Sequence, residues 1–325
     1  MKMNQLFYKR CLRMYAWYSS QRKIWGEPCP KTVAQCLRFI LSIARLKFEF
    51  YFLDNLYLPY IEIAITTRCT LKCKHCSSYI NTIEEKDLYS LTFEEFKRQI
   101  DNLLANVKKL HVLKVFGGEP LLNQDLDKIL RYSLANKKIS NVILTTNGTM
   151  DISDKLISIM KEHRKKMYVN LSNYTSNKEL SPRLKTIELL NKCKENSIAT
   201  IFDENLLWRE TSEIKYSGRT PKEIRKYFFK CTKRCLHIKK WTLYPCPWAA
   251  MYDFKNLYLP SLQIVKNWSA WTKAGGGTIE KIDLSNPVKK ETLVRFYSNS
   301  DYLACGFCSI IEDNLKKRVI PAIQE

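Results

Sequence analysis

Short apolar runs alternate with longer amphipathic segments between residues 60 and 202. Short runs bounded by turn residues predict strands, and apolar side chains at helical spacing predict helices. The predicted strands span 61–66, 110–116, 142–146, 168–172 and 198–202, and the predicted helices span 92–107, 121–136, 153–163 and 182–196. Five strands that alternate with helices predict a parallel sheet with right-handed crossovers. Periodicity leaves open whether this sheet is doubly wound or forms a complete or partial barrel.

A basic segment precedes these repeats and contains a further predicted helix. Residues 31–52 carry apolar side chains at helical spacing, namely Val33, Leu37, Ile40, Leu41, Ile43 and Ala44. Basic residues lie between them, so we expect an amphipathic helix whose apolar face packs on the main domain. Contact with a membrane surface is the alternative. The stretch 34–53 contains Arg38, Arg45, Lys47 and Glu49, so it does not predict a transmembrane helix.

Composition restricts the class of protein. A chain of 325 residues suits a large α/β domain with an appendage. The formal net charge of +22 comes mostly from lysines scattered along the chain. A nucleic-acid surface is typically a dense basic stripe with aromatic residues, so we do not expect a specific nucleic-acid partner. Twelve cysteines in a chain of this size, with no recognisable signal peptide, predict reduced thiols and a cytoplasmic location.

Three cysteines follow the first predicted strand. Cys69, Cys73 and Cys76 have Cys-x3-Cys-x2-Cys spacing. Three thiolates on a short loop can hold three irons of a [4Fe-4S] cluster, because sulfur ligands suit iron–sulfur clusters, zinc or copper(I). The fourth iron would stay open to a small molecule. A zinc knuckle with a fourth ligand from elsewhere, or thiols without a metal, are the alternatives.

Polar and glycine-containing sequences follow the next three strands. Gly117, Gly118 and Glu119, with Pro120, end the second strand. The glycines would allow close approach of a ligand to the backbone, and Glu119 can accept hydrogen bonds from an ammonium group. The third and fourth strands end in short polar side chains that suit hydrogen bonds to a ribose or a carboxylate. These candidates are Asn147, Ser172 and Asn173, with an ordinary turn as the alternative at Asn147.

The cysteine spacing, with His75 before the last cysteine, and the Gly-Gly-Glu-Pro sequence resemble the signature of the radical S-adenosylmethionine (SAM) enzymes. The resemblance implies a partial (β/α)6 TIM-type barrel whose cluster loop follows the first strand. It implies reductive cleavage of SAM to a 5′-deoxyadenosyl radical, which abstracts a hydrogen atom from the substrate. It also implies that Glu119 and the glycines bind the SAM amino group, that His75 covers the cluster or SAM, and that Ser172 lies near the ribose. A flavodoxin or a ferredoxin is the expected reducing partner.

A second group of cysteines lies beyond residue 208 and comprises Cys231, Cys235, Cys246, Cys305 and Cys308. Residues 235–246 predict a hairpin that turns at Lys239 and Lys240. We expect Cys235, Cys246, Cys305 and Cys308 to hold an auxiliary [4Fe-4S] cluster, with structural zinc as the alternative. The arrangement resembles the twitch domain, a shortened SPASM domain, although Trp241 stands where that family has glycine. Cys231 could replace Cys235 as a ligand, be an inert core thiol, or donate a hydrogen atom to a substrate radical.

These patterns predict an α/β fold in three parts. They are a basic helical extension at 1–57, a radical SAM core at 58–208 and a small Cys-rich α+β appendage at 209–325. The predicted activity is of the oxidoreductase or isomerase type, the oxidation or epimerisation of a small polar molecule such as a sugar or nucleotide sugar. The alternatives are maturation of a ribosomally made peptide and non-catalytic zinc or iron–sulfur binding. Peptide-modifying relatives often carry an N-terminal recognition domain, for which the extension is too short.

Overall fold

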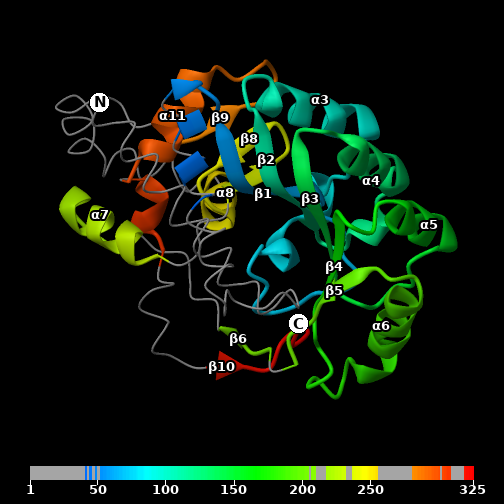
Figure 1. The fold of residues 1–325 in the computed structure, drawn as a ribbon. Coiled ribbons are helices and arrows are strands. Elements are labelled where there is room, and N and C mark those ends of the chain that lie inside the picture. Colours follow the sequence, from blue (N-terminus) through cyan, green and yellow to red (C-terminus); the bar gives the residue numbers. More distant parts are fainter. Residues whose placement is uncertain are drawn as a thin grey trace.

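An eight-stranded sheet forms the centre of the protein, with the strand order β5-β4-β3-β2-β1-β7-β8-β9 (Figure 1). The computed structural model describes residues 41, 44–45, 48–49, 52–204, 206–209, 217–231, 236–254, 280–300, 302–308 and 318–325. The strands of this sheet are β1 (Tyr57–Thr66), β2 (Lys109–Gly117), β3 (Ile139–Thr146), β4 (Met167–Leu171), β5 (Ala199–Ile201), β7 (Leu236–Lys239), β8 (Thr242–Tyr244) and β9 (Ile282–Asp283). A second sheet pairs β6 (Trp208–Arg209) with β10 (Arg318–Val319).

The first five strands are parallel and alternate with helices, which confirms the predicted α/β fold class. The connecting helices are α3 (Phe93–Leu104), α4 (Leu126–Ala135), α5 (Asp154–Glu162) and α6 (Thr186–Glu195). Figure 1 shows them in an arc outside the strands, as in a partial barrel. The helix predicted over 121–136 begins only at Leu126, because Pro120–Leu122 is a short 3-10 turn. The Asn123 side chain also donates hydrogen bonds to the backbone carbonyls of Ile65 and Leu91, which holds this residue outside the helix.

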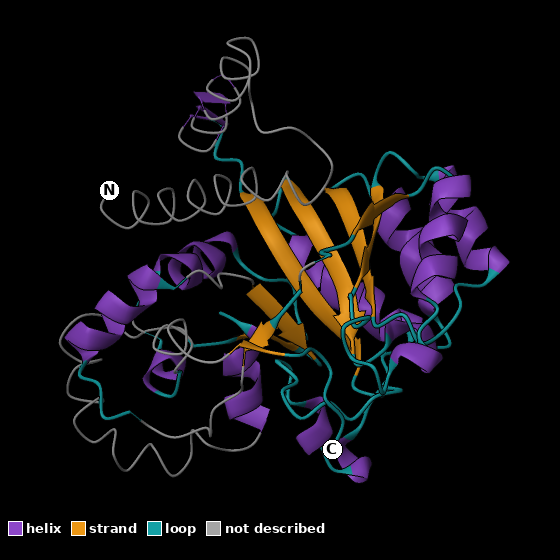
Figure 2. Cartoon of the chain, turned by 90° about the horizontal axis from the view of Figure 1, so that it is seen from below, coloured by secondary structure: helices purple, strands orange, loops and turns teal. Residues whose placement is uncertain are grey.

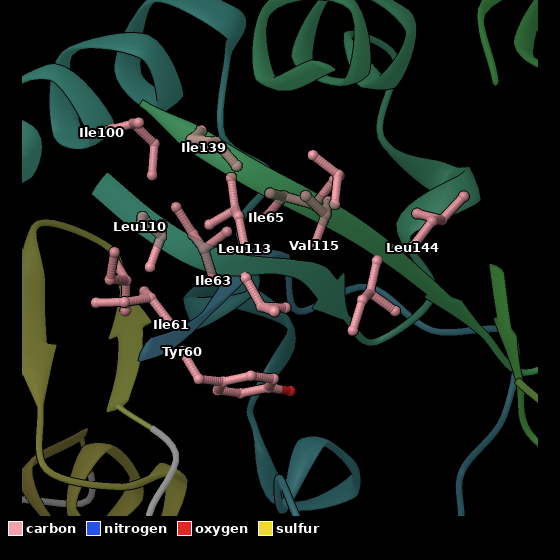
Figure 3. Packing of buried hydrophobic residues seen from close by; sticks show 14 of the residues in the cluster. Tyr60, Ile61, Ile63, Ile65, Ile100, Leu110, Leu113, Val115, Ile139 and Leu144 are labelled. Carbon is pink, nitrogen blue, oxygen red and sulfur yellow. The ribbon is translucent and has the colours of Figure 1, made fainter. Parts of the chain in front are cut away.

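The core lies on both faces of β1, where every residue after Tyr57 is buried. Parallel strands covered on both faces typically show such continuous apolar runs. Figure 3 shows Ile100 of α3 among the side chains of β1, β2 and β3, including Ile63, Leu113 and Ile139. Burial of each such side chain contributes roughly 1.5–3 kcal/mol. The packed core therefore fixes the strand ends from which the functional loops leave.

The predicted hairpin is present, and it extends the central sheet. Strand β7 lies parallel to β1 and then pairs with β8 as an antiparallel hairpin (Figure 2). The turn prediction was wrong by one residue: Lys239 still pairs with Thr242, and Lys240 has φ 50 at the turn. Trp241, in the position of the family glycine, lies against Arg98 of α3, with 4.5 Å between the guanidinium and the ring centre. The sheet thus continues across residue 208, while the three-part domain division stays a prediction.

Only a few residues of the N-terminal helix lie within the described part of the chain. Of its predicted apolar face, Leu41 and Ala44 are described, and both are exposed. At these positions the predicted packing on the main domain is wrong. Among the described residues of this segment, the one that is buried is Glu49. Its carboxylate accepts hydrogen bonds from Arg45, Asn55 and Tyr57. A buried carboxylate with three donors anchors this end of the extension by polar contacts.

The remaining described helices include α7 (Pro221–Lys230), α8 (Pro247–Phe254) and α11 (Lys290–Ser298). They cover the side of the sheet that carries β7, β8 and β9 (Figure 1). Within the described part of the chain, no helix is both long enough and apolar enough to cross a membrane.

Candidate active site at the strand ends

The two glycines after β2 bring the backbone against the cysteine loop. The Gly118 nitrogen donates to the Thr66 carbonyl at 2.9 Å, and the Glu119 nitrogen donates to the Arg68 carbonyl at 2.8 Å. A Cβ atom would lie 2.1 Å from the Thr66 carbonyl oxygen if added to Gly117, and 2.1 Å from that of Arg68 if added to Gly118. The close approach that requires glycine is therefore made by the chain leading into Cys69.

Glu119 connects the ends of β2 and β3. Its buried carboxylate accepts hydrogen bonds from the Leu121 nitrogen at 3.1 Å, the Thr146 hydroxyl at 2.9 Å and the Asn147 nitrogen at 2.8 Å. Burial raises the pKa of Glu119 to about 7, and the three donors act against this rise. The carboxylate thus organises the loop with three protein donors, and its contact with a SAM ammonium group stays a prediction.

Asn147 extends this network to the cysteine loop. Its side-chain nitrogen lies 3.0 Å from the Thr70 hydroxyl and 3.7 Å from the Cys69 sulfur. The Thr70 and Thr149 hydroxyls are 2.6 Å apart, and Thr149 in turn donates to the Asn147 side-chain oxygen. Asn147 is buried, so the side chain predicted as a ligand contact also supports the loop that carries Cys69.

The cysteines of the triplet are enclosed. Cys73 is buried, and Cys69 and Cys76 are half-buried. Burial raises the pKa of Cys69 to about 11, that of Cys73 to about 12, and that of Cys76 above its usual value. Neighbouring thiolates add to the rise at Cys69 and Cys73, because the three cysteines lie near one another. Bound iron would favour the thiolate forms of these side chains.

A single metal ion and an iron–sulfur cluster place different demands on the spacing of three thiolates. Among the residues the structure describes, no three His, Cys, Asp or Glu side chains are arranged around one ion. A cluster accepts a wider spacing, because each of the three thiolates binds a different iron. The loop after β1 carries three thiols, with the polar ends of β2 and β3 beside it.

The residues at the end of β4 differ in their roles. Asn173 is buried, and its amide nitrogen donates to the carbonyls of Asp203 at 3.0 Å and Glu204 at 3.2 Å. Its side-chain oxygen accepts from the nitrogen and the hydroxyl of Thr175. Ser172 is only half-buried, and it bonds through its side chain to Tyr174. The ribose contact predicted for this pair is therefore easier to reconcile with Ser172 than with Asn173.

His75, between Cys73 and Cys76 in the loop, is buried. Its predicted role as a cover over the cluster or SAM stays a prediction.

Four cysteines of the second group lie within the described part of the chain, and Cys231 is one of them. Cys231 ends α7, Cys246 precedes α8, and Cys305 and Cys308 lie at a 3-10 turn (Leu303–Gly306) and just after it. Burial raises the pKa of Cys246 and Cys305, and the thiolates of Cys231 and Cys308 raise both further. These four thiols therefore lie near one another. Cys235, the ligand predicted in this group, lies outside the described residues, as do Cys11, Cys29 and Cys36.

A narrow recess of about 10 Å³, with room for about one water molecule, opens beside the cysteine loop. It lies where β1, β2, β7 and α8 meet, and its wall includes Thr67, Ser78, Gly117, His237 and Lys239. His237 and Lys239 are both buried. The described lining residues contain this ammonium and imidazole but no carboxylate. A buried ammonium group such as that of Lys239 attracts an anionic or strongly polar ligand.

A polar network lies behind this recess. The Nδ1 atom of His237 is 3.1 Å from one carboxylate oxygen of Glu62, and Lys114 Nζ is 3.8 Å from the other. Burial lowers the pKa of His237 despite the adjacent carboxylate. Glu62 and Lys114 can balance each other's charge, while Lys239 contacts the Met251 sulfur at 3.0 Å. The sequence did not indicate this network, because its members come from β1, β2 and β7.

Comparison with known families agrees with this geometry. Residues 63–211 match the family model described as the Radical SAM superfamily. This part of the chain, which runs from Ile63 in β1 through β5 and holds the three-cysteine loop, is a radical SAM domain. The family implies a [4Fe-4S] cluster and SAM as its cofactors.

Among curated proteins, the chain is 31% identical over 140 residues to a GTP 3′,8-cyclase of Aliarcobacter butzleri, covering 42% of this chain and 41% of that protein. It is 32% identical over 116 residues to the antilisterial bacteriocin subtilosin biosynthesis protein AlbA of Bacillus subtilis, covering 36% of this chain and 24% of that one. The matched region thus spans less than half of either relative.

Among solved structures, BtrN in complex with AdoMet and 2-DOIA is similar with a TM-score of 0.42 and 14% identity. That match covers 59% of this chain and 74% of BtrN.

Proposed function

We propose that the protein is an enzyme that holds a [4Fe-4S] cluster on Cys69, Cys73 and Cys76 and binds SAM at the adjoining strand ends. The observation that carries this proposal is the backbone contact of Gly117, Gly118 and Glu119 with the cysteine loop. When bound, the reduced cluster and SAM would supply a 5′-deoxyadenosyl radical for hydrogen abstraction. The protein's own residues would position the loop, enclose the thiolates and exclude water from the strand ends.

This proposal is tested by anaerobic reconstitution followed by iron and sulfide analysis. With SAM and a reductant, the wild-type protein should form 5′-deoxyadenosine, and a Cys76→Ala variant should form none. Bound zinc without iron, and no nucleoside product, would favour the non-catalytic alternative.

For the substrate, we propose a small polar molecule with an anionic group, such as a sugar phosphate or nucleotide sugar, undergoing oxidation or epimerisation. The buried Lys239 ammonium in the wall of the recess beside the cysteine loop supports an anionic group on the substrate. The similarity to proteins named GTP 3′,8-cyclase also agrees with a phosphorylated substrate.

The substrate proposal is tested by adding candidate sugar phosphates and nucleotide sugars to the loaded enzyme. A true substrate should increase 5′-deoxyadenosine formation and transfer deuterium to it from the labelled position. Lys239→Met should raise the KM at least tenfold, whereas Lys240→Met, at the exposed turn of the same hairpin, should not. Equal effects of the two variants would argue against an anion site at Lys239.

Peptide maturation is the second candidate function, and the similarity to AlbA favours it. It would be supported if a precursor peptide, rather than a sugar derivative, stimulated SAM cleavage and emerged with a changed mass or a cross-link.

We also propose an auxiliary [4Fe-4S] cluster on Cys246, Cys305 and Cys308, with Cys231 or Cys235 as the fourth ligand. The electrostatic coupling among the described thiols supports it. Two clusters correspond to about eight irons per chain, whereas one cluster and a structural zinc site correspond to about four irons and one zinc.

The proposed partner is a reducing protein such as flavodoxin or ferredoxin. The net charge of +22 would favour an acidic partner, so electron transfer should slow as ionic strength rises. A rate independent of salt would count against electrostatic docking. The cytoplasmic location stays a prediction.

A further inference from the structure

Residues 318–325 return to the cysteine loop and pair with it. Strand β10 first pairs with β6, and Figure 1 shows both strands near the chain end marked C. Beyond β10, Cys73 and Gln324 form an antiparallel bridge. The Lys74 nitrogen donates to the Ile323 carbonyl at 2.8 Å, and the Glu325 nitrogen donates to the Lys72 carbonyl at 2.9 Å. These backbone bonds lie on both sides of Cys73.

The Gln324 side chain completes the contact. Its oxygen accepts from the Lys72 nitrogen at 2.9 Å, and its nitrogen lies 3.4 Å from the Cys73 sulfur and 2.6 Å from the Ala322 carbonyl. The neighbours fix the amide orientation, because a flipped amide would place its NH2 group against the Lys72 N–H. Gln324 therefore presents an N–H donor to the Cys73 sulfur.

Further contacts also hold this segment. The Asn177 side chain donates to the carbonyls of Pro321 at 3.2 Å and Ala322 at 2.9 Å. Ala322 is fully buried in a cluster with Leu71 and Tyr174, and its φ of 57 is rare for a residue with a side chain. Such a backbone conformation persists only where the surroundings enforce it. The segment is thus held in one conformation on the loop.

We propose that residues 318–325 form a clamp on the cluster loop, and that Gln324 is a positioning residue that donates a hydrogen bond to the Cys73 thiolate. This inference rests on the proposed function, in which Cys73 binds the cluster. Hydrogen bonds to cluster sulfurs are one way in which proteins set the reduction potential. A donor at Cys73 stabilises the more negative, reduced cluster and so eases the uptake of an electron.

The test uses two variants of Gln324 and a neighbouring control. Gln324→Met removes the donor and the acceptor at similar length, and Gln324→Glu keeps the acceptor for Lys72 but removes the donor. Glu325→Gln is the control, because Gln keeps an oxygen for the hydrogen bond that Asn81 donates to Glu325 at 2.8 Å. Each protein is reconstituted and titrated with reductant while the SAM-binding cluster is followed by EPR.

At one fixed potential, Gln324→Met should lower the ratio of reduced to oxidised cluster about fivefold, the effect of one hydrogen bond. Gln324→Glu should lower it further because it adds a negative charge, whereas Glu325→Gln should not lower it, because it removes a negative charge that acts on Cys73. Wild-type titration curves for both Gln324 variants, or an equal shift in the control, would overturn the inference.

A second measurement needs no cluster. In the apoprotein, the 7% exposed Cys73 should react slowly with iodoacetamide. Asn177→Ala, which removes two of the hydrogen bonds that hold the segment, should increase the alkylation of Cys73 about tenfold by opening the clamp, while the buried Cys193 stays unchanged. Unchanged alkylation at Cys73 would contradict the clamp. If instead the wild type bound no cluster and cleaved no SAM, the proposed function would fail while this assay still reported on the clamp.

Discussion

The carboxylate of Glu119 accepts a hydrogen bond from the backbone nitrogen of Asn147 at 2.8 Å. This contact joins the Gly-Gly-Glu-Pro sequence after β2 to the polar end of β3. Asn147 then reaches Thr70 and the Cys69 sulfur through its side chain. The motif that resembles a SAM-binding sequence thus also supports the loop that would carry the cluster.

Substitution of Gly118 by alanine should disrupt this support. A Cβ atom there would lie 2.1 Å from a backbone oxygen, so the loop must shift. We expect a loss of about 3 kcal/mol or more in the free energy of unfolding, measured by urea denaturation, together with reduced iron loading. Gly218→Ala is the control: φ there is +72, but nothing lies within 4 Å. It should cost only about 1–2 kcal/mol and leave iron loading unchanged. Equal losses in the two variants would show that contact with the loop is unimportant.

The stability of the apoprotein should depend on the ionisation of Glu119. Its pKa is about 7 in the folded protein and near 4.5 in the unfolded chain. A raised pKa stabilises the folded state below pH 4.5, and this contribution is lost as the pH rises through 7. The wild type should therefore lose on the order of 3 kcal/mol relative to Glu119→Gln between pH 4.5 and pH 8. Urea denaturation at several pH values measures this difference. A constant difference would mean that the three donors keep the carboxylate ionised throughout.

Substitutions of Asn173 and Ser172 should distinguish an effect on protein stability from an effect on SAM binding. Asn173→Ala removes donors to two backbone carbonyls, so it should lower the free energy of unfolding by about 2–3 kcal/mol. Ser172→Ala should cost less than about 1 kcal/mol but weaken SAM binding, measured by equilibrium dialysis of the loaded protein. If Asn173→Ala kept full stability and lost SAM affinity, Asn173 would be the ribose contact instead.

Cys231→Ala distinguishes the roles open to this thiol. If Cys231 is the fourth ligand of the auxiliary cluster, iron per chain should fall from about eight to about four, as in Cys308→Ala. Cys193→Ala, a core substitution within α6, should keep the full iron content. Full iron in Cys231→Ala would leave Cys235 as the ligand. Cys231 would then be an inert thiol if turnover and uptake of solvent deuterium were unchanged, and a hydrogen donor if that uptake ceased.

Much of the fold follows from local patterns. The apolar runs predicted β1 to β4 within a few residues of their ends, and Thr92 with Glu95 caps α3 as a capping box. The helix predicted from 121 began later because Asn123 bonds to β1 and to the chain before α3. No local pattern shows such long-range bonds, which is why element ends were less accurate than element types.

The sequence by itself determined the order of strands and helices, the cysteine loop after β1 and the glycines after β2. These features depend on periodicity, spacing and turn chemistry, which are properties of residues close together in the sequence. Only the tertiary structure placed β7 beside β1, Cys231 near Cys305, and Gln324 on Cys73 across 251 residues. Contacts between distant segments depend on how the packed sheet and its loops fill space. No pattern within either segment specifies its partner. The spacing of the cysteines could therefore be predicted from the sequence, whereas the residues that contact them could not.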